Sequence, residues 1–459
     1  MSFFLILKKC LDAFKVESEL NLAYLYGKKS KVINKLQLKK KFSGPFFQFL
    51  IFLFYTIKKL SFFSSKESKK FIYAYAESNN QYTSISRTIL KFLEKKYEIH
   101  LVNENFVQID EQLKKYTKPL QINLKLFCVI LLLFALKAPL LHINLKRLSN
   151  SKEISYFINQ FYMSYFYLPY FLDQLYKYKP KFVLMSNDTN VSCRSLKLAA
   201  EILNIKTVYL QHSSVSTLFP PLGHNYIFLD GQASLDIYHK NEIDNSLNLK
   251  KNSVRHIFLS GNKRKLIKLD LNKKDQIGIA INRLDDLEIF KKICFKLINL
   301  GFKVRIRFHP GTSNLIKNKF INIFKNNSLF QYKDTNKESV SDFFGNLCCL
   351  IGGESGIHLE AAICGVVPIY YKTQADFYDM SGFVKYGIAY EANKAKDIVS
   401  IINKIKLNKL KVNKSAVKYF SSTFLTEWQG REDELVVNHL LSIFKNIDPK
   451  ELYGYNCLK

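Results

Sequence analysis

The sequence has few acidic residues for its length. Its 459 residues include 38 Asp and Glu against 69 Lys and Arg, which gives a formal net charge of +31. Such a balance favours an anionic partner, which would be nucleic acid, an anionic membrane surface or an anionic substrate. The abundance of Lys, Asn, Ile and Phe is typical of an AT-rich genome and accounts for part of the Lys excess. It does not account for the shortage of acids.

Several patterns that would assign a function are also missing. None of the eight Cys residues forms a C-x-x-C pair and most have apolar neighbours, which indicates reduced, buried thiols. There is no Walker A loop and no G-x-S-x-G elbow. Zinc-finger spacing, a helix-turn-helix signature and an RNP-like aromatic motif are absent as well. We therefore do not expect nucleic acid to be the partner.

Long hydrophobic runs are few and short. The N-terminal "MSFFLILKKCLDAF" has no preceding basic region and no small-residue cleavage site, so it does not predict a signal peptide. Two other runs, Pro45 to Leu60 and Leu126 to Leu148, fall short of the roughly 20 residues of a spanning helix, the second because Lys137 and Pro139 break it. Both are flanked by Lys. They predict contact with one anionic membrane face; the alternative is two buried helices of a large core.

What is present is an alternation of strand and helix patterns in two series. The first includes "KFIYAYAES", "EIHLV", "PKFVLMSNDT" and "KTVYLQHSS", and the second includes "QIGIAINRLDD", "FKVRIRFHPG", "CCLIGGESG" and "VVPIYY". Helical patterns between them predict parallel sheets. We expect a basic apolar leader at 1–68, a first domain at 69–250 with a helical insertion at about 105–175, a second domain at 251–415, and C-terminal helices at 416–459 that cross back. Ligands of such sheets bind beyond the carboxyl ends of the strands.

The stretch "LIGGESGIHLEAAICG" carries the clearest signal. A buried strand runs into Gly353, Glu354, Ser355 and Gly356 and then into a helix. Glycines let a ligand approach the backbone, and a helix N-terminus suits a phosphate. Ser355 would add a hydroxyl donor, and Glu360, one turn later, would accept the hydroxyls of a ribose. The alternative is an ordinary strand-to-helix turn with an N-cap serine.

A second signal is "FKVRIRFHPG". Arg305, Arg307 and His309 share one face of the strand, and His309-Pro310 ends it. We expect Arg307 and His309 to stabilise a leaving phosphate. The alternative is a solvated arginine face with a capping histidine.

Together these two stretches resemble bacterial GT-B glycosyltransferases of capsule and surface polysaccharide synthesis, over roughly residues 180 to 375. In the sialyltransferase-like and polysialyltransferase-like members, a His-Pro motif and a Ser-containing motif hold the CMP of a CMP-sugar. Those families commonly show paired serines where this chain has Glu354-Ser355-Gly356. The stretches also resemble glycerophosphotransferases of teichoic acid synthesis and, more faintly, UDP-GlcNAc 2-epimerases. The predicted donor-binding set comprises Asn282, Arg283, Arg307, His309, Pro310, Gly353, Glu354, Ser355, Gly356 and Glu360.

Polar residues at other strand ends complete the predicted site. Asp188 ends a central strand and would take the proton of an acceptor hydroxyl; the alternative is an N-cap of the next helix. "QHSSVS" resembles the Gln-His turn of capsule-type GT-B chains, so Gln211, His212 and Ser213 are assigned to the acceptor side, with His212 as the rival base. Asp285 and Asp286 weakly resemble an acidic pair upstream of the His-Pro motif; the alternative is a pair of acids favoured by a helix N-terminus.

The resemblance implies an α/β GT-B fold, with two Rossmann-like domains whose parallel sheets face a central cleft. It implies transfer of an acidic, nonulosonic-type sugar from a CMP donor to a lipid-linked capsule or surface glycan. We expect no cofactor and no metal, because Asp-x-Asp sequences are absent from plausible strand ends. The protein would lie peripherally on the inner face of the bacterial plasma membrane. The alternatives are a UDP-sugar glycosyltransferase, a CDP-polyol phosphotransferase, a UDP-sugar 2-epimerase-like enzyme and a non-catalytic basic scaffold.

Overall fold

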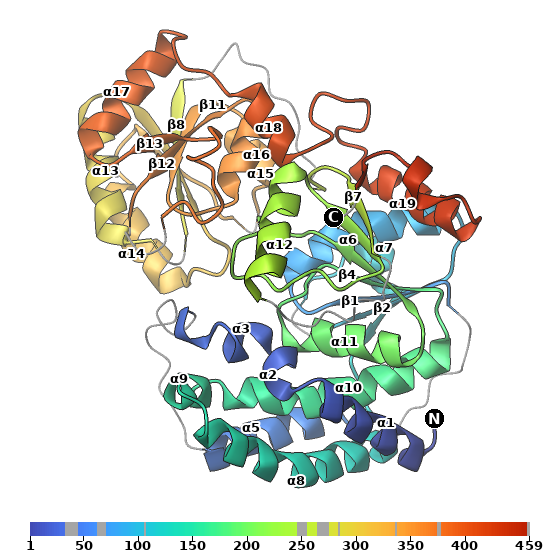
Figure 1. Cartoon of the computed structure of the whole chain (residues 1–459). Helices are drawn as coiled ribbons and strands as arrows, with labels where there is room; N and C mark the ends of the chain where they lie inside the picture. The colour runs from blue at the N-terminus through green and yellow to red at the C-terminus, as the bar shows by residue number, and fades with distance from the viewer. Residues whose placement is uncertain are drawn as a thin grey trace.

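The computed structural model describes residues 1–32, 45–61, 70–104, 107–245, 255–263, 275–282, 285–335, 337–373 and 378–456. Within them the chain forms two α/β units, each built around its own sheet, with a helical layer beneath the first unit (Figure 1).

The first sheet has the strand order β14-β7-β6-β5-β4-β1-β2-β3 among the described residues. Its strands pair in parallel except for β14, which runs antiparallel to β7. The strands are β1 (Ile72–Ala76), β2 (Ile99–Asn103), β3 (Thr117–Pro119), β4 (Phe182–Met185), β5 (Lys206–Leu210), β6 (Tyr226–Leu229), β7 (His256–Leu259) and β14 (Tyr455–Asn456).

Both faces of this sheet are covered, as continuous apolar strands require. On β1, Tyr73 and Tyr75 pack toward α10, whereas Ile72 and Ala74 pack toward α6 and α19. Ser78 caps α6 by accepting a hydrogen bond from Gln81 N–H at 3.4 Å. The helices of this unit are α6 (Asn79–Glu94), α7 (Glu111–Lys114), α9 (Ser151–Ser155), α10 (Ile158–Tyr178), α11 (Val191–Ile202), α12 (Gln232–Asn245) and α19 (Glu432–Phe444).

The second sheet has the strand order β10-β9-β8-β11-β12-β13 among the described residues, and all its pairs are parallel. The strands are β8 (Gln276–Ile281), β9 (Lys303–Phe308), β10 (Phe330–Tyr332), β11 (Leu347–Gly352), β12 (Val367–Tyr371) and β13 (Tyr390–Ala392), and the helices are α13 (Leu287–Asn299), α14 (Asn314–Phe324), α15 (Val340–Phe344), α16 (Ile357–Ile363), α17 (Ala395–Lys406) and α18 (Lys414–Phe420). Gly365, which follows α16, has φ +79°, a conformation that glycine adopts without strain. The prediction of two parallel-sheet domains is confirmed.

The predicted boundary between the domains is wrong by one strand. β7 was assigned to the second domain, but it pairs with β6 in the first sheet. The C-terminal segment crosses back to the first unit. α19 packs on the first sheet, a short 3₁₀ turn at Pro449–Glu451 follows it along the chain, and β14 then extends the sheet.

The residues called the leader are not separate from the first unit. The N-terminal helices α1 (Phe3–Val16), α2 (Glu19–Leu22), α3 (Tyr24–Gly27) and α5 (Pro45–Lys58) join the long helix α8 (Leu124–Lys146) in the layer beneath α10 and α11 (Figure 1). The predicted break in α8 is wrong, because the helix runs through Pro139. Buried residues on both sides of the proline, such as Leu133 and Leu141, pack into one core, and this packing offsets the lost backbone hydrogen bond.

A buried ion pair fastens α5 to the sheet. Lys59 Nζ lies 2.7 Å from Glu104 Oε2, and both side chains are about 5% exposed or less. Glu104 Oε1 accepts hydrogen bonds from Tyr55 and Tyr167, at 2.8 and 3.0 Å. The carboxylate is therefore fully engaged only while α5 stays docked.

We predict that Lys59→Met lowers the free energy of unfolding by about 3–5 kcal/mol, because it leaves the Glu104 charge buried without its partner. Denaturant titration measures the change. The matched control is Lys70→Met, which removes an ion pair whose Glu98 partner is 64% exposed and should cost about 0–1 kcal/mol. Equal losses in the two variants would contradict the account.

Candidate functional site at the meeting of the two sheets

The loops at the carboxyl ends of the two sheets come into contact. Ser214, in the loop after β5, lies so near Gly356 that a Cβ on that glycine would be 3.1 Å from the Ser214 oxygen. Next to this contact is a cavity of only about 10 Å³, lined by residues of both units, including Gln211, Asp230, Leu359 and Ser381. The sequence motifs "QHSSVS" and "GGESG" thus face each other across the domain boundary.

His309 stands at the end of β9, half-buried, as the sequence analysis expected. Its backbone N–H donates to Ile281 O at 2.9 Å, which ties it to the end of β8. Its ring Nδ1 accepts the Gly311 N–H at 3.0 Å. In a neutral ring the proton therefore sits on Nε2, and that nitrogen has the chemistry of a hydrogen-bond donor. Pro310 follows on the exposed surface.

The arginines of β9 do something other than predicted. Arg305 pairs with the Glu338 carboxylate, and Arg307 NH1 donates to Glu338 O at 3.1 Å and lies 3.6 Å from Oε2. Both guanidinium groups also lie over the Phe343 ring. Arg307 is 8% exposed. The expected phosphate contact of Arg307 is not what this geometry provides, because the alternating arginines form a buried cluster around one carboxylate.

The Gly353–Gly356 turn is held by side chains rather than left open. A Cβ on Gly353 would lie 2.3 Å from Asp285 Oδ1, so the glycine admits this carboxyl group. Asp285 accepts the Asn282 N–H at 2.7 Å, and Asn282 Nδ2 donates to Glu354 O at 2.8 Å. Burial raises the pKa of Asp285 to about 6. Asp286 instead caps α13, as its alternative reading held. Arg283 lies outside the described residues.

Glu354 has a structural role that its sequence position did not reveal. Its two oxygens accept hydrogen bonds from Tyr370 OH, Met380 N–H, Ser381 N–H and Ser381 OH, at 2.7–3.1 Å. These bonds fix the segment that follows β12 beside the turn. Ser355 is half-buried and its Oγ accepts the Ile357 N–H at 3.5 Å, whereas Glu360 is 4% exposed in the first turn of α16. The contacts of Ser355 and Glu360 with the nucleotide of the sugar donor stay predictions.

On the opposite side, Gln211 is also structural. Its Oε1 accepts the Asp230 N–H at 2.9 Å and its Nε2 donates to Ser213 O at 3.0 Å, so the side chain, 3% exposed, ties the loop after β5 to the end of β6. His212 and Ser213 are half-buried on this loop, with Ser213 Oγ 3.5 Å from His212 Nε2. Their assignment to the acceptor side stays a prediction.

Asp188 lies in a buried polar chain at the end of β4. Tyr238 OH donates to its Oδ2 at 3.1 Å and itself lies 3.1 Å from Tyr209 OH, so Tyr209 is the donor of that second bond. Asp188 is 4% exposed, and burial raises its pKa to about 7, against the lowering effect of Tyr238 and Arg194. It does not cap α11, because Asn190 does. A carboxyl group with a pKa near neutrality is suited to general-base catalysis.

Three residues of this region were missed by the sequence analysis. Glu77, at the end of β1, accepts hydrogen bonds from Ser192 at 2.6 Å and from Asn190, and burial raises its pKa to about 7. Its position directly after a strand, like that of Asp188, was the available signal. Tyr238 and His224 carried no such signal, because they reach Asp188 and its surroundings from elements distant in sequence.

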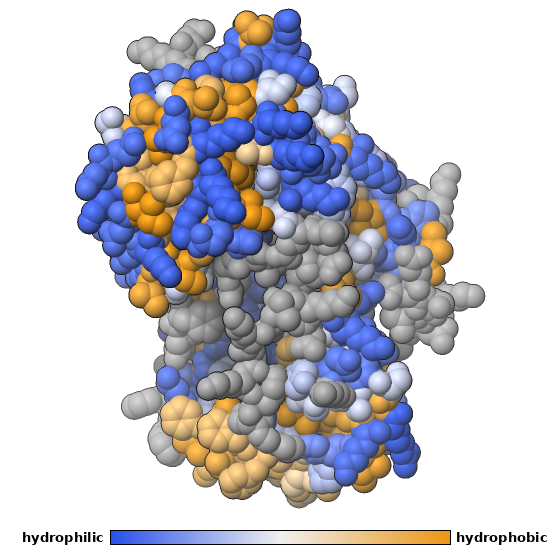
Figure 2. Space-filling model, turned by 90° about the vertical axis from the view of Figure 1, so that its left-hand side faces the viewer, coloured by the Kyte–Doolittle hydropathy of each residue, from blue (hydrophilic) through white to orange (hydrophobic). Residues whose placement is uncertain are grey.

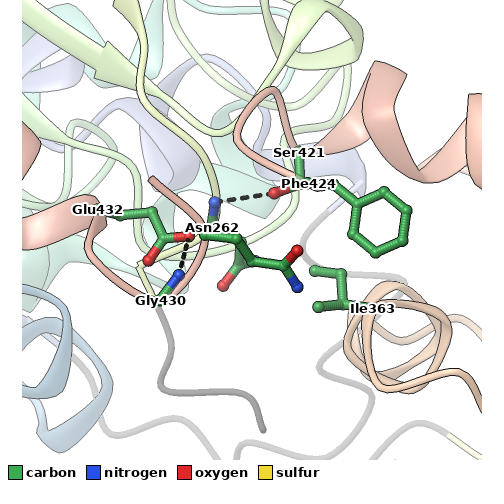
Figure 3. A pocket seen from close by; sticks show the side chains of 7 residues that line it. Asn262, Ile363, Ser421, Phe424, Gly430 and Glu432 are labelled. Carbon is green, nitrogen blue, oxygen red and sulfur yellow. Dashed lines mark hydrogen bonds between the residues drawn. The ribbon is translucent and has the colours of Figure 1, made fainter. Parts of the chain in front are cut away.

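The joint between the units is packed closely. A cavity of about 10 Å³ lies where the segment after β7 crosses the C-terminal segment. Figure 3 shows side chains that line it. Asn262 N–H donates to Ser421 Oγ at 3.1 Å, and Gly430 N–H donates to Glu432 Oε1 at 2.9 Å. Such a volume admits about one water molecule, so this cavity is part of the joint rather than a ligand site. Among the residues the structure describes, no group of three His, Cys, Asp or Glu could hold a metal ion.

Comparison with known proteins shows a shared architecture. No protein-family model and no curated protein matches the sequence. A Listeria monocytogenes protein described as a UDP-N-acetylglucosamine 2-epimerase aligns over 84% of this chain and 100% of its own, with a TM-score of 0.52 and 12% identity. The calicheamicin glycosyltransferase CalG4 aligns over 83% of this chain and 100% of its own, with a TM-score of 0.53 and 7% identity.

The chain has the GT-B fold. This confirms the predicted fold class, and it leaves the reaction to be argued from the residues.

The raised pKa of Asp188 predicts a pH-dependent stability. Because the folded state holds this proton more tightly than the unfolded state, where the pKa is near 3.8, the contribution of Asp188 is greatest below about pH 4 and is lost as the pH rises through 7. Asp188→Asn should thus stabilise the protein at pH 8, on the order of 4 kcal/mol, and hardly at pH 4.

Thermal unfolding between pH 4 and 8 measures this difference. Asp286→Asn is the matched control, because Asp286 is an exposed cap and Asn caps a helix about as well. A stability difference for Asp188→Asn that does not change with pH would contradict the assignment.

Proposed function

We propose that this protein is a glycosyltransferase that moves a sugar from a nucleotide donor to a lipid-linked surface glycan. The observation that carries the proposal is the contact between Ser214 and Gly356, which joins the carboxyl-end loops of the two sheets in a GT-B fold. His309 and the Gly353–Gly356 turn come from the second sheet, and the Gln211–Ser216 loop and Asp188 come from the first. Ligands of parallel sheets bind at such ends.

On the donor side, His309 would contact the phosphate through Nε2–H. Its Nδ1 is already occupied by Gly311 N–H, so the ring is oriented in advance. A fixed donor aimed at the leaving phosphate stabilises the charge that grows there in the transition state. Ser355, Gly356 and Glu360 would hold the rest of the nucleotide. We favour a CMP-linked acidic sugar on the resemblance of the His-Pro and Ser motifs, with a UDP-sugar or a CDP-polyol as alternatives.

On the acceptor side, Asp188 would take the proton of the attacking hydroxyl. Tyr238 holds one carboxylate oxygen, so the other is the one that would receive the proton. His212 and Glu77 are the rival bases, since both stand at neighbouring strand ends.

A second candidate is a UDP-sugar 2-epimerase-like enzyme. It is favoured by the structural likeness to the Listeria monocytogenes protein, whose description names that activity. An epimerase converts its substrate with no acceptor, and this requirement separates the two reactions.

The donor half of the proposal is tested by calorimetry with CMP, CDP, UMP and UDP. We expect CMP to bind best and His309→Ala to weaken it by about tenfold or more, because a hydrogen bond to a charged group is lost. His239→Ala, an exposed histidine on α12, should change nothing. Preference for UDP would move the donor to a UDP-sugar, and binding of none of the four would refute the nucleotide site.

We further propose that the helical layer rests on an anionic membrane, on the cytoplasmic side. Exposed apolar residues gather on three adjacent helices, α1, α5 and α8, at the end of the molecule away from the second unit (Figure 2). They are Phe4, Leu5 and Val16 on α1; Phe46, Phe47, Leu50, Ile51, Phe54 and Ile57 on α5; and Leu124, Leu132, Leu136, Leu140 and Ile143 on α8. We call these residues the apolar base.

The composition of the apolar base fits a lipid surface. Phe134 of α8 stacks on Phe52 of α5 at 5.2 Å, so these helices form one surface rather than separate patches. Exposed Lys8, Lys58 and Lys146 border it and would meet lipid headgroups. α8 is long and apolar enough to cross a membrane, but a third of it is buried against the protein. Its packing on α1 and α10 favours a helix that lies along the surface.

Vesicle flotation tests the membrane proposal. We expect the protein to float with vesicles that contain an anionic lipid, and the variant Phe46→Ser/Phe47→Ser/Phe54→Ser to bind about tenfold or more weakly, since exposed phenylalanines lose their burial in lipid. Leu315→Ser, at a site 81% exposed on α14, is the matched control and should bind as the wild type does. The proposal is refuted if the triple variant binds the vesicles as the wild type does. It is also refuted if the three substitutions disrupt a dimer of the protein instead of vesicle binding.

A further inference from the structure

A polar cavity that opens to solvent lies beside Asp188, between the N-terminal helices and α11. Its volume is about 140 Å³, roughly ten times what one ordered water needs. The residues that line it include Glu17, Asn21, Tyr24, Asp188, Arg194 and His224. One wall is therefore the segment that ends α1 and forms α2 and α3, and the opposite wall is the start of α11 with the loop before β6.

The cavity is surrounded by buried polar atoms that no described residue satisfies. These atoms are Glu17 Oε1, Asn21 Oδ1, Asp188 Oδ1 and both ring nitrogens of His224. Asp188 is 4% and His224 2% exposed. Buried polar groups in native proteins are nearly always hydrogen-bonded, so this concentration around one cavity indicates a polar occupant.

The cations at the cavity are already engaged. Arg194 Nε donates to Asn21 O at 2.6 Å, its NH1 donates to Asp188 O at 3.3 Å, and its guanidinium lies over the Tyr24 ring. Lys197 pairs with Glu201 at 2.6 Å, and it packs against Gly223, where a Cβ would lie 2.9 Å from Lys197 Cε. What the cavity still offers is mainly acceptor oxygens, together with a histidine that burial keeps neutral by lowering its pKa.

These groups select the chemistry of the occupant. The carboxyl groups of Glu17 and Asp188 disfavour an anion, and the nearby Arg194 and Lys197 disfavour a cation. Unsatisfied oxygens call for several hydroxyl donors, and His224 can donate from one nitrogen and accept at the other. Tyr24 and two prolines that line the cavity supply the less polar surface against which the C–H face of a sugar ring packs.

We propose that this cavity is a subsite for one uncharged, hydroxyl-rich unit, a sugar residue of the acceptor glycan. The inference rests on the proposed function, because it places the acceptor beside the presumed base Asp188. α1 links the cavity to the apolar base: Phe4 and Val16 place both ends of the helix in that base, and Glu17, which caps its C-terminal end, lines the cavity. A glycan held by its lipid in the membrane would thus reach the site past the C-terminal end of α1.

The test measures binding of neutral sugars by ligand-observed NMR, with N-acetylglucosamine, methyl galactoside and methyl glucoside as probes. At least one should bind saturably, and Glu17→Gln and Asn21→Leu should each weaken it by about fivefold or more, the loss expected for one hydrogen bond. Asp12→Asn, on the exposed side of α1, is the matched control and should bind as the wild type does. Thermal unfolding confirms that each variant is folded.

The other outcomes refute the subsite. They are binding of none of the sugars, which means that only water fills the cavity; displacement of a bound sugar by inorganic phosphate or Mg²⁺; and equal binding by wild type, Glu17→Gln and Asn21→Leu. Titration of CMP and UDP into the same samples separates the two proposals. If the wild type binds a nucleotide but no sugar, the subsite alone is refuted. If the wild type binds neither CMP nor UDP, the proposed function is refuted.

Discussion

Parallel pairing of the strands is the constraint on which the site depends. It puts the carboxyl end of every central strand at the same edge of its sheet, so residues far apart in sequence become neighbours there. The GT-B arrangement then brings the two edges together, to the point where Ser214 and Gly356 touch. Most polar side chains at this boundary, including Glu354, Gln211 and Asn282, are used to hold the loops in place. His309 and Asp188 are the two that we propose for the chemistry.

The N-terminal helices link the two unusual properties of the chain, its basic charge and its exposed apolar residues. They are docked by a buried ion pair between Lys59 and Glu104, so the apolar base has a fixed position relative to the first sheet. The same segment forms a wall of the cavity at Asp188. In this account α1 and the segment after it join the membrane face to the acceptor cavity and the base, and the nucleotide lies on the far side of the domain boundary. The lysines that border the apolar base would then meet the lipid headgroups.

The sequence was sufficient for the fold and for the strand ends, because hydrophobic period and glycine position are local signals. It placed His309, the Gly353–Gly356 turn and Asp188 correctly at carboxyl ends. It could not show that Arg307 is paired with Glu338, or that Tyr238 holds Asp188. These contacts join residues that are 31 and 50 positions apart in the sequence. Likewise Lys137 and Pro139 suggest a helix break when read alone, and only packing on α1 and α10 shows why α8 continues.

The most direct measurement of the central claim is turnover with an acceptor present. The protein would be incubated with CMP-sugars and UDP-sugars, with and without vesicles that carry a lipid-linked glycan, and the products would be weighed by mass spectrometry. The account predicts release of the nucleotide and a glycan heavier by one sugar, only when the acceptor is present and not with Asp188→Asn. Conversion of a UDP-sugar to its epimer without any acceptor would contradict it.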